Sequence, residues 1–189
     1  KSRELGKEEY YRLLNAAVSE KRERLSGILR TIAATGMRIG ELRYLTVETL
    51  SRQKIEIHFK GKQRVILMAR SLVIFLRDYC RRNRITSGII FATKNGNPVD
   101  RRNIWAEMKE LCGPARVLPS KVFPHNLRHL FARCFYERER DLVRLADYLG
   151  HSSIETTRRY TMITSEEACA RELELGLAGN ESWGGAEKK

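Results

Sequence analysis

The chain has 189 residues, of which 42% are hydrophobic, and a formal net charge of +13. This length and apolar content suffice for one buried domain. No apolar run approaches the roughly 20 residues of a membrane span, and the N-terminus shows no signal-peptide pattern, so we expect a cytoplasmic protein with no membrane partner. The basic charge favours a polyanionic partner, and nucleic acid is the first candidate.

The charge is unevenly distributed along the chain. Residues 161–189 contain six Glu, one Arg and two Lys, a net charge of −3, which leaves +16 on residues 1–160. We therefore expect residues 1–160 to form the surface that faces nucleic acid.

Four early segments carry apolar residues at helical spacing. Their apolar positions recur at intervals of three and four, which predicts amphipathic helices that bury one face in a shared core. Gly36 fits the end of the second helix, because glycine readily adopts the left-handed conformation that ends helices. The segments are 10–18, 25–33, 72–80 and 104–112.

Residues 54–68 instead alternate between apolar and polar side chains, which predicts a β-hairpin with its turn at Gly61. A further short strand is expected at 89–91, followed by a turn at 95–98. The hairpin has a basic tip that consists of Lys60, Lys62 and Arg64.

Three helices are expected between residues 124 and 160. The first begins at Pro124, because proline is tolerated in the first turn of a helix. The second covers 141–149, with Asp141 as its N-terminal cap and Gly150 as its C-terminal cap. The third leads to Tyr160.

The fold class predicted from these elements is mainly α with a small antiparallel β-hairpin, that is, α+β. A last helix is expected over 165–175. Residues 176–189 are rich in Gly, Glu and Lys and are expected to be disordered.

The segment from His125 to Tyr160 combines cations with groups that handle protons. His125 and Arg128 are one helical turn apart and so share a face. Arginine forks match phosphate oxygens, imidazoles such as that of His151 shuttle protons, and a phenol can act as a nucleophile, so the segment fits chemistry on a phosphodiester. A zinc site at His125 and His129 is disfavoured, because no Glu follows the first His as in HExxH and Arg128 would repel the metal.

Two further candidates lie upstream. Arg38 follows the end of the second helix, and Glu41 lies one turn later, where its carboxylate can orient the guanidinium and leave other donors for a ligand. The alternative is an ordinary surface pair that contributes about 0.3 kcal/mol. Lys60 has three interpretations, which are a phosphate contact, a general acid and a solvated turn residue.

The order of these residues resembles that of the tyrosine recombinases, also called the phage-integrase family. The resemblance extends from about residue 5 to residue 175 and rests on the segments 34–42, 125–129 and 149–152. The hairpin departs from the family pattern, because residues 60–64 are one shorter than the frequent Lys-Gly-x-Lys-x-Arg. Lys60 is therefore the expected hairpin lysine, and Lys62 is the alternative.

The resemblance implies the tyrosine recombinase catalytic-domain fold over residues 1–175, with no metal and no cofactor. In that scheme two arginines bind the scissile phosphate, a tyrosine attacks phosphorus, a lysine protonates the departing 5′-oxygen, and either of two histidines is the base. The implied catalytic set is Arg38, Lys60, His125, Arg128, His151 and Tyr160, with Glu41 as an accessory residue and Lys62, Arg64, Arg158 and Arg159 as DNA contacts.

The implied activity is site-specific recombination of double-stranded DNA through a 3′-phosphotyrosyl intermediate, for integration or excision of a mobile element. The alternatives are DNA relaxation of the type IB topoisomerase kind and a Xer-like resolvase role. A homotetramer on DNA would form through 165–175, with packing of that segment in cis as the alternative. We expect the family's N-terminal core-binding domain to be absent from this chain, and hence weak DNA binding with little sequence discrimination.

Overall fold

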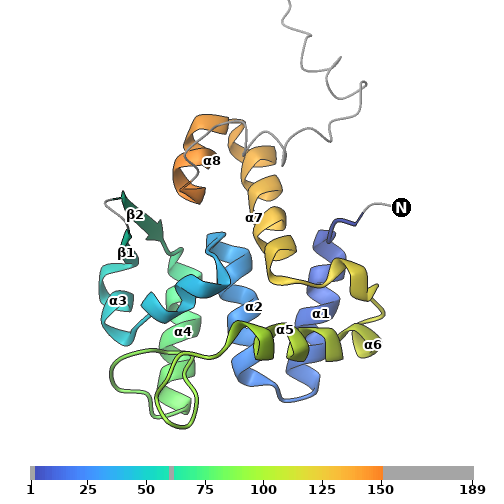
Figure 1. Cartoon of the computed structure of the whole chain (residues 1–189), viewed down its shortest axis with the longest axis horizontal. Helices are drawn as coiled ribbons and strands as arrows, with labels where there is room; N and C mark the ends of the chain where they lie inside the picture. The colour runs from blue at the N-terminus through green and yellow to red at the C-terminus, as the bar shows by residue number, and fades with distance from the viewer. Residues whose placement is uncertain (1–2, 60–61, 151–189) are drawn as a thin grey trace, which may run out of the picture.

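The computed structural model describes residues 3–59 and 62–150 (Figure 1). The fold class is confirmed, because helices dominate and the described strands form one antiparallel pair. Predictions for 152–160, 165–175 and 176–189 lie outside the described residues. The elements are α1 (Lys7–Ser19), α2 (Glu23–Thr35), η1 (Ile39–Tyr44), α3 (Val47–Arg52), β1 (Lys54–Phe59), β2 (Lys62–Leu67), α4 (Arg70–Arg82), α5 (Arg101–Glu110), α6 (Cys112–Ala115), η2 (Pro119–Lys121), α7 (Pro124–Glu139) and α8 (Leu142–Leu149).

Helix α2 is the central element of the core. It packs against α1, α4 and α7, which surround it in Figure 1. Four of the five residues of its predicted stripe are buried, with Ala33 partly exposed, and each large buried side chain contributes about 2 kcal/mol through the hydrophobic effect. The buried four are Leu25, Ile28, Leu29 and Ile32. Within the ranges given above, no helix is both long and apolar enough to cross a membrane.

Helices α7 and α8 form a second, smaller apolar cluster. Leu145 and Leu149 of α8 are buried with Ala132 of α7, and Phe131 and Phe135 pack against them. Helix α8 also contacts β2, so it lies between α7 and the hairpin (Figure 1). This position brings the end of α8 to the hairpin.

The segment 89–91 was predicted as a strand, and that prediction is wrong. It makes an isolated bridge from Ile89 to Thr46 and joins no described sheet. Ile90 and Phe91 are nevertheless buried, at 1% and 2% exposure. The apolar run therefore reflects burial of a loop, which a short apolar segment does not distinguish from a buried strand.

Candidate active site

Gly36 sets the direction in which the chain leaves α2. It ends the helix in the left-handed conformation, with φ of 63°. A Cβ atom at this position would lie 2.4 Å from the Cδ1 atom of Phe131, so the chain turns directly against α7. Arg38 follows in extended backbone, with φ of −75° and ψ of 146°. The end of α2 at Gly36 is as predicted, and it delivers Arg38 beside α7.

Glu41 holds both the backbone and the side chain of Arg38. The Arg38 amide donates to Oε2 of Glu41 at 2.6 Å, and its Nη1 donates to Oε1 at 3.1 Å. The Glu41 side chain is 11% exposed and that of Arg38 is 50% exposed. The carboxylate is therefore fixed in the protein, while the guanidinium reaches solvent, which is the arrangement expected for an oriented ligand-binding arginine.

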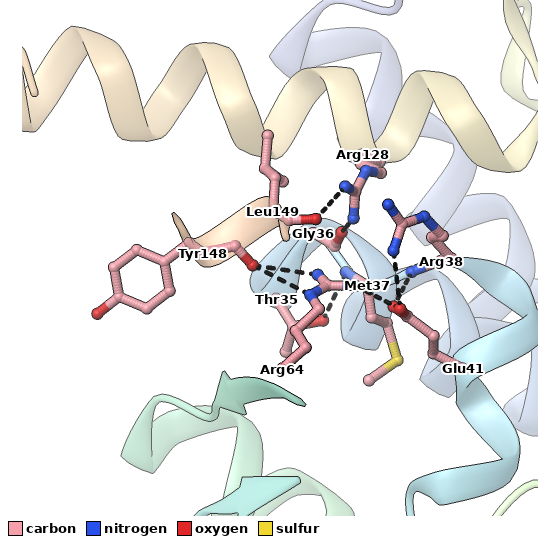
Figure 2. Close-up of polar contacts among 9 residues, drawn as sticks. All are labelled: Thr35, Gly36, Met37, Arg38, Glu41, Arg64, Arg128, Tyr148 and Leu149. Carbon is pink, nitrogen blue, oxygen red and sulfur yellow. Dashed lines mark hydrogen bonds and ion pairs between the residues drawn. The ribbon is translucent and has the colours of Figure 1, made fainter. Parts of the chain in front are cut away.

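Arg128 lies on α7 and is buried, at 2% exposure. Its guanidinium donates through Nη1 to the Gly36 carbonyl and through Nη2 to the Leu149 carbonyl, the latter at 2.6 Å (Figure 2). These carbonyls end α2 and α8, and helix ends present acceptors without intrahelical donors. Arg128 therefore joins the ends of two helices at the site.

Arg64 occupies a different position from the one expected at a basic hairpin tip. In the hairpin register it is paired with Ile57, whose side chain is buried, so Arg64 belongs to the inward face. Its guanidinium donates to Glu41 and to the carbonyl oxygen of Tyr148, the latter at 3.1 Å from Nη2 (Figure 2). The structure thus gives Arg64 internal contacts, and its expected contact with DNA stays a prediction.

His125 and His129 lie one turn apart on α7, and their ring centroids are 4.3 Å apart. Desolvation lowers the pKa of His125, and the positive charges of Arg128 and Arg38 lower it further. Burial, with His125 and Arg133 nearby, lowers the pKa of His129 to about 4. Lowered pKa values favour the neutral imidazoles, the form in which His125 can accept a proton.

One cavity, with a volume of about 760 Å³, is lined by Arg38, His125 and Arg128. Arg43, Tyr44 and Arg101 also line it, and these three are exposed. Sequence reasoning missed them, because Arg101 lies 63 residues from Arg38 and no local pattern connects the two. The cavity thus presents several guanidinium groups, an imidazole and a phenol to solvent.

Other predicted site residues are not placed by the structure. Lys60, His151, Arg158, Arg159 and Tyr160 lie outside the described residues. Lys62 begins β2. The described chain ends at Gly150, whose φ of 61° ends α8 as predicted and which directly precedes His151.

The free energy of unfolding should fall as the pH drops from 6.5 towards 4. In this window His129 takes up a proton in the unfolded chain, whereas its lowered pKa keeps it neutral in the folded protein. We expect a loss of about 2 kcal/mol, because one pKa unit corresponds to about 1.4 kcal/mol and partial exposure of the ring reduces the full effect.

Urea unfolding between pH 4 and pH 7 measures this loss. His129→Gln should weaken the pH dependence, and the same change at His58, which is exposed on β1, should leave it in place. An identical pH profile for wild type and His129→Gln would contradict the assignment to His129.

The fold is that of a recombinase core. The crystal structure of XerA recombinase matches with a TM-score of 0.74 and 29% identity, over 89% of this chain and 61% of the XerA chain. The XerH site-specific recombinase, in a pre-cleavage complex bound to its difH substrate, matches with a TM-score of 0.71 and 26% identity, over 89% of this chain and 53% of XerH.

The sequence comparison gives the family. The model of the Phage integrase family matches residues 3–167, and the chain therefore belongs to this family. Tyrosine recombinase XerA of Pyrococcus furiosus is 32% identical over 170 residues, which cover 86% of this chain and 58% of XerA. Tyrosine recombinase XerD of Staphylococcus saprophyticus is 30% identical over 149 residues, which cover 74% of this chain and 50% of XerD. The chain thus spans between half and three-fifths of the length of these relatives.

Proposed function

We propose that this chain carries the strand-breaking site of a site-specific DNA recombinase. The observation that carries the proposal is the convergence of Arg38 and Arg128, from separate elements, on one cavity that His125 also lines. Two arginines beside a neutral imidazole suit a phosphodiester, because they bind its oxygens while the imidazole accepts a proton. Membership of the Phage integrase family supports the same chemistry.

In the proposed reaction, Oη of Tyr160 attacks the scissile phosphorus. A bond from phosphorus to Oη forms as the bond to the 5′-oxygen breaks, which leaves a 3′-phosphotyrosyl link. Lys60 protonates the departing oxygen, with Lys62 as the alternative acid, and His125 takes the phenol proton. Attack by the 5′-hydroxyl of another strand then releases Tyr160 and completes strand exchange.

The two arginines act on the transition state in this scheme. Negative charge grows on the non-bridging oxygens as phosphorus becomes pentavalent, and fixed guanidinium groups stabilise that charge more than they stabilise the substrate. Glu41 and the carbonyls of Gly36 and Leu149 hold these groups in place before DNA arrives. Such preorganisation lowers the barrier because no reorganisation is needed during the reaction.

The charge of the cavity supports a polyanionic substrate. Among the described residues that line it, Glu41 is the one carboxylate, and it is already paired with Arg38 and Arg64. The exposed side chains of Arg43 and Arg101 add positive charge to the same wall. A DNA backbone supplies regularly spaced phosphates for such a surface.

Two biological roles use this chemistry. Integration or excision of a mobile element is the role expected from the sequence, and the similarity to XerA and XerD supports a Xer-like resolvase role. In both roles we propose a homotetramer on paired double-stranded DNA sites, with residues 165–175 as a contact between copies.

A trapping experiment tests the proposed activity. The protein is incubated at low salt with short nicked duplexes of randomised sequence, in which the cleaved fragment diffuses away and prevents religation. We expect a protein–DNA adduct that survives denaturing electrophoresis and disappears after protease treatment. Absence of the adduct with the wild-type chain would contradict the proposal.

Supercoiled plasmid separates the related activities. Relaxation without exchange between sites would point to a type IB topoisomerase. Exchange between two plasmids indicates integration, and excision between repeats on one plasmid indicates resolution or excision.

A further inference from the structure

The guanidinium of Arg64 lies between two parts of the site. Its side chain is 9% exposed and forms an ion pair with Glu41 on one side. On the other side, Nη2 and Nε donate to the Tyr148 carbonyl at 3.1 and 3.4 Å. Figure 2 shows this guanidinium reaching from the end of α8 to the carboxylate that holds Arg38.

We propose that Arg64 is a positioning residue that fixes Arg38, through Glu41, and the C-terminal end of α8, through Tyr148, in one arrangement. The proposal rests on the proposed function, since it assigns Arg64 a part in DNA cleavage. It replaces the direct DNA contact that the basic hairpin tip suggested.

The end of α8 is built around two arginines from different elements. The last carbonyls of a helix lack intrahelical donors, and cations near them are favoured by the helix dipole. Arg64 from β2 serves the Tyr148 carbonyl, and Arg128 from α7 serves the Leu149 carbonyl. The end of α8 is therefore held from two sides.

Gly150 gives independent support for close contact at this point. A Cβ atom there would lie 2.5 Å from Cδ of Arg64, so a larger residue would displace the Arg64 side chain, and the φ of 61° also favours glycine. The aliphatic part of Arg64 thus packs directly against the chain that leaves α8. A side chain that reached out to DNA would vacate this contact.

Burial separates Arg64 from the arginines suited to DNA contact. Arg43 and Arg101 line the same cavity but are exposed, whereas Arg64 directs its donors to Glu41 and Tyr148. Glu41 accepts from Arg64 and Arg38 with the same oxygen, Oε1, so among the described residues loss of Arg64 leaves Arg38 as the remaining cation paired with that carboxylate. The carboxylate would then be held by the amide and guanidinium of Arg38 without the ion pair to β2, and the position of Arg38 would be less fixed.

Amide hydrogen exchange on the free protein tests this arrangement without relying on activity. The Arg38 amide donates to Glu41, and the Gly150 amide donates to Asp147 at the end of α8. In Arg64→Met both amides should exchange about tenfold faster, while amides of α1 and α4 remain unchanged. Arg64→Lys keeps the positive charge but replaces the guanidinium with a single ammonium group. This variant is measured instead if Arg64→Met does not fold.

Cleavage of saturating nicked duplex gives the second readout. Arg64→Met should slow adduct formation on the order of a hundredfold, the effect of a misplaced catalytic group. The salt dependence of DNA binding should not change. In an Arg38→Ala background, the added Arg64→Met change should slow adduct formation no further. A general loss of structure would instead slow the reaction in that background as well.

Arg101→Met is the matched control. It removes an exposed arginine from the same cavity wall and should reduce the slope of log affinity against log salt by about 0.9, with unchanged exchange at Arg38 and Gly150. If Arg64→Met behaves like Arg101→Met, Arg64 is a DNA contact and the proposal is overturned. If the wild-type chain forms no adduct, the proposed function fails, and the exchange measurements alone decide the role of Arg64.

Discussion

Replacing Tyr160 with phenylalanine is expected to reduce covalent adduct formation by at least about a thousandfold, since loss of a nucleophile removes the covalent route itself. The change deletes one oxygen and retains the ring. DNA affinity should stay within about twofold, because binding depends mainly on cations that contact phosphates. Denaturing electrophoresis after incubation with nicked duplex measures the adduct, and a gel-shift assay measures affinity.

The structure provides a matched control for this prediction. Tyr44 lines the cavity and is 37% exposed, so its phenol is placed to approach a bound phosphate. Tyr44→Phe removes the same atom from a residue that lies beside Arg38 in the cavity wall. The adduct should persist in Tyr44→Phe. Its loss there, with retention in Tyr160→Phe, would assign the nucleophile to Tyr44.

The long helices were predictable because their burial is periodic. The stripe in α2 places Leu25, Ile28, Leu29 and Ile32 on one face, and each is essentially inaccessible. The elements η1 and α3 were missed, since six residues make at most two turns and bury few positions. Short elements are specified by tertiary contacts more than by their own pattern.

The candidate site was predictable as a set of residues, and its internal contacts were not. The spacing of Arg38 and Glu41 predicted their pairing, because both lie within one turn. The partners of Arg128 lie 92 and 21 residues away in sequence, at Gly36 and Leu149. Contacts of this kind arise where helix ends meet, and no local sequence pattern predicts them.

The prediction for Arg64 used its charge and its nearness to the turn, and it left out the alternation of side chains along a strand. Its charge and nearness to the turn indicated an exposed tip, but the strand period decides which face a side chain occupies. Val65 and Leu67 are exposed at 37% and 50%, and Ile66 between them is buried at 1%, so Arg64 shares the inward face with Ile66. An arginine is tolerated on this inward face because its charge is paired with that of Glu41.

Alanine at Arg38 and alanine at Arg128 are expected to slow cleavage to a similar degree and to differ in their effects on stability. Each removes a guanidinium that would bind the scissile phosphate, and loss of one such group costs a factor of about a hundred or more in rate. Single-turnover formation of the adduct at saturating nicked duplex measures this factor for both variants.

The stability difference follows from burial. Arg38 is half exposed, and Glu41 keeps its ion pair with Arg64 when Arg38 is lost, so the free energy of unfolding should change by less than about 1 kcal/mol. Arg128 is buried, and its loss leaves the carbonyls of Gly36 and Leu149 without these donors. An unpaired buried polar group costs about 1–3 kcal/mol, so Arg128→Ala should lose about 3 kcal/mol and lower Tm by roughly 10 °C.

Arg133→Ala controls for the loss of a partly buried arginine on the same helix. Arg133 donates to the Leu5 carbonyl and pairs with Glu4, and it lies outside the residues that line the cavity. It should lower Tm and leave the cleavage rate unchanged below Tm, because its partners Glu4 and Leu5 lie outside the cavity lining. An Arg128→Ala variant with wild-type Tm would contradict the account of the buried contacts, and full cleavage by Arg38→Ala would contradict its contact with the phosphate.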